Sequence, residues 1–197
     1  MSFDLGLTGS IGMGKSTTAR MFADEGCDLW DADAAVHRLY APGGAAVAPL
    51  AQEFPDAIRD GCVDRAALRD AIAKDPDNLA RIEAIVHPLV AQDRAEFRTR
   101  ARAEIRVYDI PLLFETGGEA EMDAVACVWV APEIQRARVL ARGTMSAEQF
   151  ERILSKQMPS DEKRARADFQ IETDTLDHAR QQVQDVIRQI KTRQAHA

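Results

Sequence analysis

Residues 9–17 read Gly-Ser-Ile-Gly-Met-Gly-Lys-Ser-Thr, the complete pattern of a phosphate-binding P-loop. The apolar run Phe3–Thr8 leads into the pattern, and Thr17–Phe22 has the composition of a helix. This order of strand, loop and helix is the context that the motif requires. A glycine-rich turn that merely caps a helix would not need every fixed position to match. The stretch therefore predicts a nucleoside triphosphate site.

Each residue type in the loop has a chemical task. Glycines adopt backbone angles that let successive N–H groups surround phosphate oxygens, and the helix N-terminus favours negative charge. The lysine of this motif reaches the β- and γ-phosphates, and the hydroxyl after it coordinates Mg²⁺. We expect the next hydroxyl to contact the α-phosphate. The residues expected to bind ATP are Gly9, Gly12, Met13, Gly14, Lys15, Ser16 and Thr17, with Ser16 as a magnesium ligand.

Composition excludes several classes of protein. The 197 residues suit one domain with a small insertion, and a chain of this size buries roughly 70% of its unfolded surface. A net charge of −7 argues against a protein that coats nucleic acid. No run of about twenty apolar residues is present to span a bilayer, and no leader pattern precedes the first strand. These features predict a cytoplasmic protein with no membrane or nucleic-acid partner, and nothing in the sequence indicates an obligate protein partner.

The cysteines and the basic residues each have a simple interpretation. Cys27, Cys62 and Cys127 are odd in number and far apart, so we expect buried, reduced thiols and no disulfide framework. The segment from Glu133 to Arg166 contains eight basic and five acidic residues, which gives it a net charge of +3. That segment either receives a phosphate-rich ligand or forms a pair of solvated amphipathic helices.

Short apolar runs alternate with helical patterns along the chain. This alternation predicts an α/β fold of the P-loop NTPase type, a parallel five-stranded sheet flanked by helices. The expected strands are Leu5–Thr8, Cys27–Trp30, Ile105–Ile110, Ala124–Val130 and Phe169–Ile171. The expected helices are Gly14–Asp24, Ala32–Tyr40, Ala45–Glu53, Arg65–Ala73, Asp77–Arg102, Pro132–Arg142, Ala147–Lys156, Ser160–Ala167 and Leu176–Arg193.

Two segments exceed what a simple strand crossover needs. Roughly seventy residues separate the second strand from the third, where about a dozen suffice. We therefore expect an inserted helical subdomain at residues 37–102 and a helical lid at 142–158, of the kind that closes over a triphosphate. The nucleotide-binding core is then residues 1–36, 103–141 and 159–197 of a single kinase domain spanning 1–197.

Carboxylates follow two of the predicted strands. Ligands of open α/β sheets bind beyond the carboxyl ends of the strands, so Asp31, Asp33 and Asp109 are expected near the P-loop. Asp33 is a candidate base for an attacking hydroxyl, with Asp31 as its orienting partner or a metal contact. Either residue serves equally well as a helix cap. Asp109 is a candidate for holding Mg²⁺, directly or through water.

An arginine and an apolar ledge complete the candidate site. Arg142 ends a predicted helix at the lid, where it is placed to stabilise charge on a transferring phosphoryl group. Leu112, Leu113 and Phe114 follow Pro111 and form an apolar ledge, either core or substrate wall.

In combination these features resemble dephospho-coenzyme A kinases along nearly the whole chain. The matching pieces are the P-loop with Leu7 and Thr8, Asp31–Asp33 with His37–Leu39, His87–Val90, Asp109–Glu115, Arg136–Arg142, Arg152 and Ile153 with Gln157, and Ala167 with Asp168. The resemblance implies transfer of the γ-phosphate of ATP to the 3′-hydroxyl of dephospho-coenzyme A, with Mg²⁺ as cofactor, as the last step of coenzyme A synthesis.

The resemblance also implies residue roles. Asp33 is then the catalytic base and binds the substrate, while Lys15 and Arg142 stabilise the phosphoryl group. The insertion at 37–102 becomes a coenzyme A-binding domain, and His87 and Leu113 belong to the acceptor side. A histidine before proline can instead end a helix turn. Glu172 and Thr173 stand where the family often has an asparagine near the adenine.

Two other readings explain the same P-loop. One is a kinase of a nucleoside monophosphate or a small polyol. The other is a nucleotide-dependent switch that hydrolyses ATP slowly and binds a partner according to nucleotide state. The two kinase interpretations differ in the molecule that accepts the phosphate, whereas a switch protein would transfer phosphate to no acceptor hydroxyl.

Overall fold

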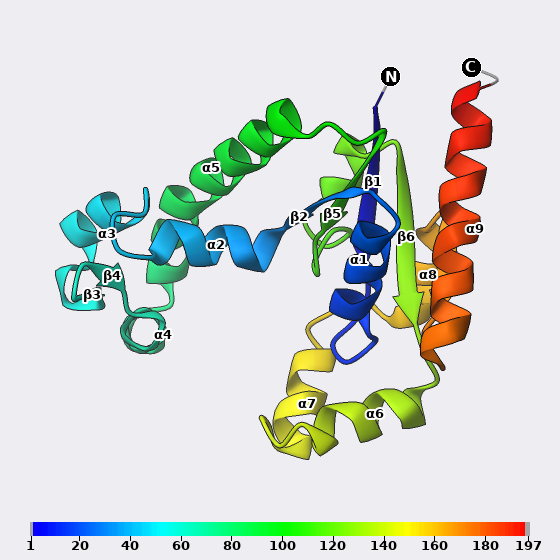
Figure 1. Ribbon diagram of the computed structural model, residues 1–197. Helices are drawn as coiled ribbons and strands as arrows, with labels where there is room; N and C mark the ends of the chain where they lie inside the picture. Colours follow the sequence, from blue (N-terminus) through cyan, green and yellow to red (C-terminus); the bar gives the residue numbers. More distant parts are fainter. Residues whose placement is uncertain (1, 196–197) are drawn as a thin grey trace. The chain divides into compact units, whose positions relative to one another are not determined.

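The computed structural model describes residues 2–195. The chain divides into two compact units (Figure 1). One unit runs up to Trp30 and resumes at Ala101, and the other is Asp31–Arg100. The second unit begins earlier than residue 37 and ends earlier than residue 102, the bounds predicted for the helical insertion.

The first unit is built on a five-stranded sheet with the order β2-β5-β1-β6-β7. Its central strand β1 pairs in parallel with β5 and β6, and β6 pairs in parallel with β7. The strand order reverses at β1, because the chain passes to β2 and β5 on one side and to β6 and β7 on the other. Ligands bind at such a switch point, beyond the carboxyl end of the strand. The strands are β1 (Phe3–Thr8), β2 (Asp28–Asp31), β5 (Ile105–Asp109), β6 (Ala124–Trp129) and β7 (Phe169–Glu172).

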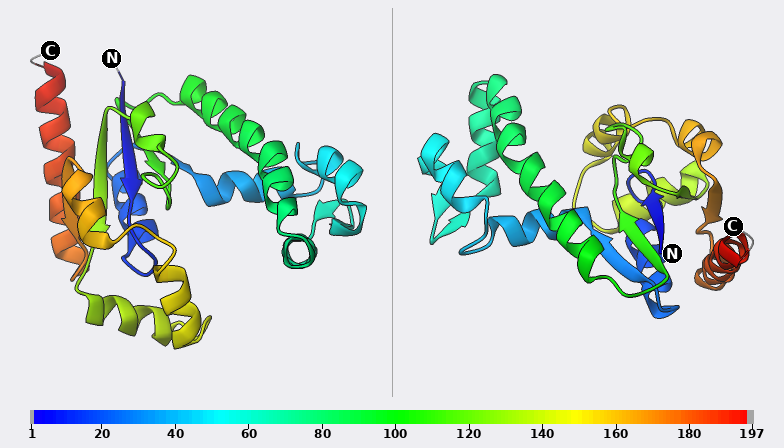
Figure 2. Two further views of the ribbon diagram at one scale, coloured as in Figure 1. Left: turned by 180° about the vertical axis from the view of Figure 1, so that it is seen from behind. Right: turned by 90° about the horizontal axis from the view of Figure 1, so that it is seen from above.

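Helices cover both faces of this sheet. Helices α1 and α9 pack against each other on one face, and α8 lies on the opposite face (Figure 2). The central strands are buried on both sides, which explains why they read as continuous apolar runs rather than as alternating patterns. The helices of this unit are α1 (Lys15–Asp24), α6 (Pro132–Ala141), α7 (Ala147–Leu154), α8 (Ser160–Arg166) and α9 (Leu176–Ala195), with a short 3₁₀ helix η2 (Gly118–Glu121).

The second unit has a core of its own. Leu50, Phe54, Leu68, Ile82 and Val86 are buried together in it. Its elements are α2 (Ala32–Tyr40), α3 (Val47–Glu53), η1 (Pro55–Ala57), β3 (Ile58–Arg59), β4 (Cys62–Val63), α4 (Arg65–Lys74) and α5 (Asp77–Arg100). The predicted strands and helices of both units are confirmed to within a few residues at their ends.

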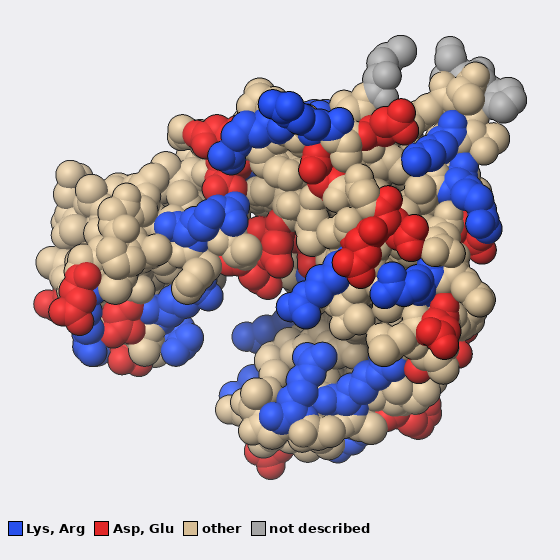
Figure 3. Space-filling model, in the orientation of Figure 1, with Lys and Arg blue, Asp and Glu red and all other residues tan. Residues whose placement is uncertain are grey.

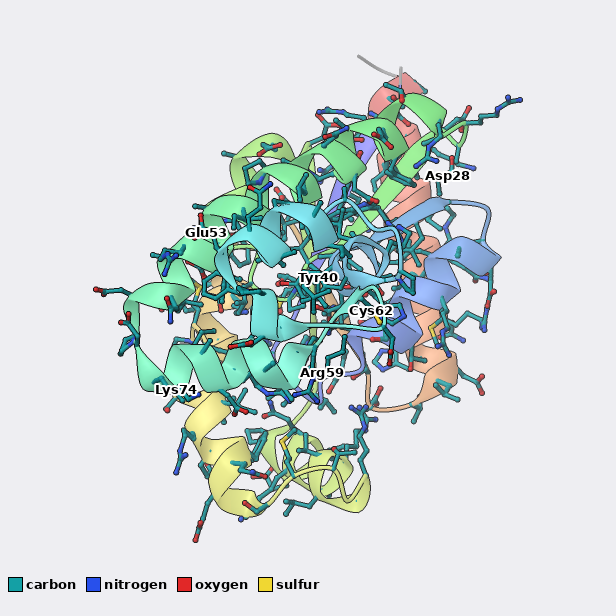
Figure 4. The ribbon with its side chains drawn as sticks, turned by 90° about the vertical axis from the view of Figure 1, so that its left-hand side faces the viewer. Asp28, Tyr40, Glu53, Arg59, Cys62 and Lys74 are labelled. Atoms are coloured by element: carbon teal, nitrogen blue, oxygen red, sulfur yellow. The ribbon has the colours of Figure 1, made fainter. Side chains whose placement is uncertain are left out.

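The sequence analysis missed the shortest elements, which are the two 3₁₀ helices η1 and η2 and the strands β3 and β4. Strands β3 and β4 form an antiparallel hairpin that carries Arg59 and Cys62 (Figure 4). Asp60 and Gly61 form its turn, with φ of 50° and 75°. Positive φ at two successive residues is the signature of a two-residue hairpin, and Asp-Gly is its commonest sequence signal. Each strand is only two residues long, which is too short to show an apolar alternation.

Helix α5 continues through Pro88, as the predicted helix Asp77–Arg102 does, so the alternative that the His87-Pro88 pair ends a helix turn is excluded. The expectation that all three cysteines are buried was wrong. Of the three cysteines only Cys127 is fully buried, while Cys27 and Cys62 are partly exposed; all three are free thiols. Burial raises the pKa of Cys127 and of Cys27 to about 11 each.

None of the helices in the described residues 2–195 is both long and apolar enough to cross a bilayer.

Candidate active site

The P-loop connects β1 to α1 and leaves the N-terminus of α1 open. Gly14 is the N-cap of α1, with a left-handed φ of 86°, and no side chain caps the helix. The first turn of α1 carries no acidic residue. Free N–H groups and the helix dipole at this end favour an anion, as a phosphate site requires.

Close packing explains two of the loop glycines. A β-carbon at Gly9 would lie 2.9 Å from the carbonyl oxygen of Val128 on β6, which cannot move aside. Gly14 has a left-handed φ, which residues with a β-carbon rarely adopt. A β-carbon there would also lie 3.1 Å from Oγ1 of Thr173, the residue just after β7. The end of β6 and the residue after β7 therefore pack closely against the loop and limit its backbone conformation.

Lys15 pairs with Asp109 at the mouth of the loop. Their side chains are 14% and 2% exposed, so the ion pair is nearly dry. Asp109 ends β5, and its backbone is in register with Leu7 of β1. The parallel sheet thus brings together a lysine and a carboxylate that are 94 residues apart in sequence. The sequence predicted that Asp109 lies near the P-loop and holds Mg²⁺, but it did not predict the ion pair with Lys15.

A cavity of about 200 Å³ lies beside the same helix N-terminus. Its lining includes Gly14 and Thr17 at the start of α1, Arg138 of α6, and Arg142 at the C-cap of α6. The remaining wall consists of Thr18, Met21, Thr173, Thr175, Leu176 and Ala179. A mixed wall of this kind, next to a phosphate site, suits the base and sugar of a nucleotide.

The two arginines of this cavity differ in how they are held. Arg138 donates to Thr173 Oγ1 at 3.1 Å, to Thr173 O at 2.6 Å and to Asp174 O at 3.2 Å. Arg142 lies one helical turn later at the C-cap of α6, is exposed, and has no ion-pair partner among residues 2–195. Arg138 therefore anchors α6, whereas Arg142 is available to an anion. Arg138 precedes Arg142 by four residues, a spacing that puts both side chains on the same face of the predicted helix. The sequence analysis did not use this spacing to assign a role to Arg138.

The structure separates the roles of Asp31 and Asp33. Asp31 caps α2, because its Oδ1 accepts a hydrogen bond from Ala34 N at 2.9 Å. Asp33 lies in the first turn of α2 and is exposed, with no side-chain hydrogen bond or ion pair within the described part of the chain. Sequence reasoning left both as equal candidates for a cap. The carboxylate of Asp33 is therefore free to meet a substrate, whereas that of Asp31 already accepts the capping bond through Oδ1.

The predicted acceptor residues have contrasting positions. His87 is exposed on α5 in the second unit. Leu113 is completely buried in a small core with Phe114 and Val125. Its side chain therefore offers no surface to a substrate, which for Leu113 favours the core interpretation of the apolar ledge over the substrate wall. Of the predicted apolar ledge, Leu112 is the residue with a large exposed surface, 43%.

The basic segment Glu133–Arg166 is not uniformly solvated. Lys and Arg side chains gather over α6 and α7 on the surface (Figure 3), where Arg136 pairs with Glu151. Lys163 of α8, in contrast, is fully buried and lies 2.8 Å from Glu115 Oε1. Burial tends to raise the pKa of Glu115, but the hydrogen bonds from Lys163 and from Met158 N–H lower that pKa below its ordinary value. Lys163 is thus a structural residue.

The predicted magnesium ligands have suitable chemistry. Ser16 lies exposed on the first turn of α1, and Asp109 is held at the neighbouring strand end by Lys15. Hydroxyl and carboxylate oxygens are the ligands that a hard cation prefers. The residues present therefore fit a Mg²⁺ ion that would be held by Ser16 and, directly or through water, by Asp109.

The sheet order, the P-loop and the paired Lys15 and Asp109 define a P-loop kinase fold and site. Comparison with known proteins names the family. The model of the dephospho-CoA kinase family matches residues 3–178. The chain belongs to this family, and it is an ATP-dependent kinase.

Individual relatives agree with this assignment. The dephospho-CoA kinase of Ruegeria pomeroyi is 70% identical over 197 residues and covers 100% of both chains. A crystal structure from Thermus thermophilus superimposes with a TM-score of 0.84 at 33% identity, covering 94% of this chain and 96% of that one. The dephospho-CoA kinase from Campylobacter jejuni shares the fold, with a TM-score of 0.70, 23% identity, and coverage of 96% and 98%.

Proposed function

We propose that this chain transfers the γ-phosphate of ATP to the 3′-hydroxyl of dephospho-coenzyme A, giving coenzyme A and ADP. The observation that carries the proposal is the Lys15–Asp109 pair at the open N-terminus of α1, in a chain that matches the family along its length. The pair supplies a cation for the phosphates of ATP and a carboxylate for the Mg²⁺ ion that accompanies them.

The nucleotide occupies the P-loop and the cavity beside it. Amides of Gly9, Gly12, Met13 and Gly14 surround the β- and γ-phosphates, and Thr17 contacts the α-phosphate. The base enters the 200 Å³ cavity, where Thr173 and Leu176 form part of the wall. Thr173 also donates to Met13 O at 2.8 Å, so the wall of the cavity and the phosphate loop are held as one rigid element.

Phosphoryl transfer is divided among three side chains. Asp33 accepts the proton of the 3′-hydroxyl as its oxygen bonds to the γ-phosphorus, and the bond from that phosphorus to the β-phosphate oxygen breaks. Lys15 holds the migrating group in line, and Arg142 stabilises its developing charge, a contribution of about 10³–10⁵ in rate in other P-loop enzymes. Ser16 and, directly or through water, Asp109 would hold a Mg²⁺ ion, whose chemistry there would be to neutralise charge on the β- and γ-phosphates.

The second unit supplies the acceptor side. We assign coenzyme A binding to the helical insertion predicted at 37–102, with exposed His87 among the residues that meet the acceptor. Arg142 begins the lid at 142–158, which encloses the triphosphate and excludes water. We further propose that the enzyme works in the cytoplasm on these two substrates, without an obligate protein partner.

An acceptor panel tests this function. ADP release is measured with dephospho-coenzyme A, with its 3′-deoxy analogue, and with nucleoside monophosphates and small polyols. We expect rapid release with dephospho-coenzyme A and background release with the 3′-deoxy analogue, which keeps every other contact of the acceptor. Rapid turnover of a monophosphate, with none of dephospho-coenzyme A, would overturn the proposal.

A further inference from the structure

Two glutamines from either side of the lid hold one residue of the P-loop. Ile11 lies between Ser10 and Gly12 in the loop. Its carbonyl oxygen accepts a hydrogen bond from Gln135 Nε2 at 2.7 Å, and its N–H donates to Gln157 Oε1 at 3.1 Å. Gln135 precedes the lid on α6 and is buried, whereas Gln157 lies at the end of the lid.

The end of the lid is also fixed to the start of the loop. The N–H of Met158 donates to Glu115 Oε1 at 3.0 Å, and Glu115 pairs with buried Lys163. Lys163 Nζ donates to the carbonyl oxygen of Pro111 at 3.2 Å, and the same oxygen accepts from Thr8 Oγ1 at 3.1 Å. Because Thr8 immediately precedes Gly9, these contacts and the Gln157 bond connect the lid end with the loop at two points.

The loop depends on these outside contacts for its shape. Three glycines among six residues give the loop backbone wide conformational freedom. Both main-chain polar groups of Ile11 are satisfied by side chains rather than by a helix or a strand. Without Gln157, the Ile11 N–H would lose its partner and the peptide would be free to rotate, which would misplace the neighbouring amides that face phosphate.

Gln157 transmits the position of the lid to this peptide. Its own N–H donates to Leu154 O at 3.2 Å, as a continuation of the last turn of α7. A displacement of α7 therefore moves the acceptor oxygen away from Ile11. Gln135, on the other side, is fixed by α6, and α6 is anchored through Arg138 to Thr173.

We propose that Gln157 is a positioning residue for phosphoryl transfer. Its side chain orients the Ile11 amide when the end of the lid is in place. Only then are the neighbouring P-loop amides held in the positions that bind phosphate. Gln135 holds the other side of the same residue at all times. This inference rests on the proposed kinase function, and it adds a coupling between the lid and the loop through one hydrogen bond.

The first test removes the acceptor oxygen with little change in side-chain size. Gln157→Met is expected to lower kcat by about 10–100-fold, the order of loss that misplaced reacting groups cause, with KM for dephospho-coenzyme A within about twofold of the parent. In the nucleotide-free protein, the amide NMR signal of Ile11 is expected to shift and its hydrogen exchange to accelerate. Gln157→Glu keeps an acceptor oxygen and is expected to retain the exchange protection of this amide.

A matched control separates positioning from general damage to the lid. Gln149 is a lid glutamine whose Oε1 accepts from Ser146 N in the capping box of α7, and within residues 2–195 no hydrogen bond joins its side chain to the P-loop. Gln149→Met is expected to leave the Ile11 amide unchanged and kcat within about threefold of the parent. Because Gln135 and Gln157 act on one residue, the loss in the double methionine variant is expected to be smaller than the product of the single losses.

The proposal is overturned if Gln157→Met leaves the Ile11 amide signal unaltered, if its kcat stays within about twofold of the parent, or if Gln149→Met is equally damaging. Full multiplicativity of the two glutamine losses would also contradict it. Failure of the parent enzyme to phosphorylate dephospho-coenzyme A overturns the proposed function instead, since the amide measurements need no acceptor.

Discussion

The buried pair of Lys163 and Glu115 leads to a stability prediction whose size follows from the structure. Lys163→Met removes a side chain that is 0% exposed and leaves Glu115, 18% exposed, without its cation. Breaking a buried ion pair from one side costs about 3–5 kcal/mol. Glu115 keeps the hydrogen bond from Met158 N–H, so we expect a loss near about 3 kcal/mol, at the lower end of that range.

For a chain of this length, about 1 kcal/mol shifts the melting temperature by roughly 2–4 °C, so Lys163→Met is expected to melt about 6–12 °C below the parent. Calorimetry at neutral pH measures the shift. Lys156→Met removes an exposed lysine of the preceding segment and is expected to melt within about 2 °C of the parent. Adding Glu115→Gln to Lys163→Met removes the unpaired charge, so part of the loss is expected to return.

The pH dependence of this loss has a defined sign. The folded-state pKa of Glu115 lies below its ordinary value of 4.5, so the pair contributes its full stability above that pH. The contribution is lost as pH falls through the lowered folded-state pKa. The difference in melting temperature between the parent and Lys163→Met is therefore expected to narrow below pH 4.5. A melting temperature of Lys163→Met within 2 °C of the parent at neutral pH, or a gap that widens in acid, would refute the reasoning.

Three further variants test the P-loop and the lid. Lys15→Met is expected to lower kcat by about 10²–10³-fold and to destabilise the fold, because it leaves Asp109 buried without its cation. Adding Asp109→Asn to Lys15→Met is expected to restore stability, measured by calorimetry, but not activity, measured by steady-state assay. Arg142→Ala is expected to lower kcat by about 10³-fold with an unchanged melting temperature, because this side chain is exposed and unpaired in the described residues; an equal loss in the neighbouring Arg136→Ala would contradict a specific role. Gly9→Ala is expected to abolish ATP binding in calorimetric titrations. Gly26→Ala, where a β-carbon meets nothing within 4 Å but φ is +88°, is expected to lose some stability and still to bind ATP normally; normal binding by both would show that the loop can shift.

Much of the fold follows from local patterns. Each buried strand of the sheet is a short apolar run, and the P-loop fixes where the first strand ends, so strand and helix positions were predictable. The insertion was predictable from the length between the second and third strands. The hairpin at 58–63 was not predicted, because its strands are too short to show a period, although its Asp60-Gly61 turn was a usable signal.

The candidate site was predictable where a motif defines it and unpredictable where packing does. Lys15, Asp109 and Arg142 were singled out by their motifs, and their catalytic roles stay predictions, whereas the ion pair of Lys15 with Asp109 became visible only in the structure. Lys163 looked like one more surface cation of a basic segment, and only the structure shows that it is buried against Glu115. Leu113 looked equally suited to core or substrate, because an apolar residue after a strand has the same pattern in both cases. Asp31 and Asp33 became distinguishable only through the capping bond to Ala34.

The central claim is that Asp33 removes the proton of the acceptor hydroxyl in a phosphoryl transfer on the P-loop. The most direct test is the rate of coenzyme A formation by Asp33→Asn in a single turnover, with ³¹P NMR locating the new phosphate. We expect ATP to bind with the affinity of the parent and the 3′-phosphate to form about 10²–10⁴-fold more slowly. Formation of coenzyme A at the rate of the parent would contradict the claim.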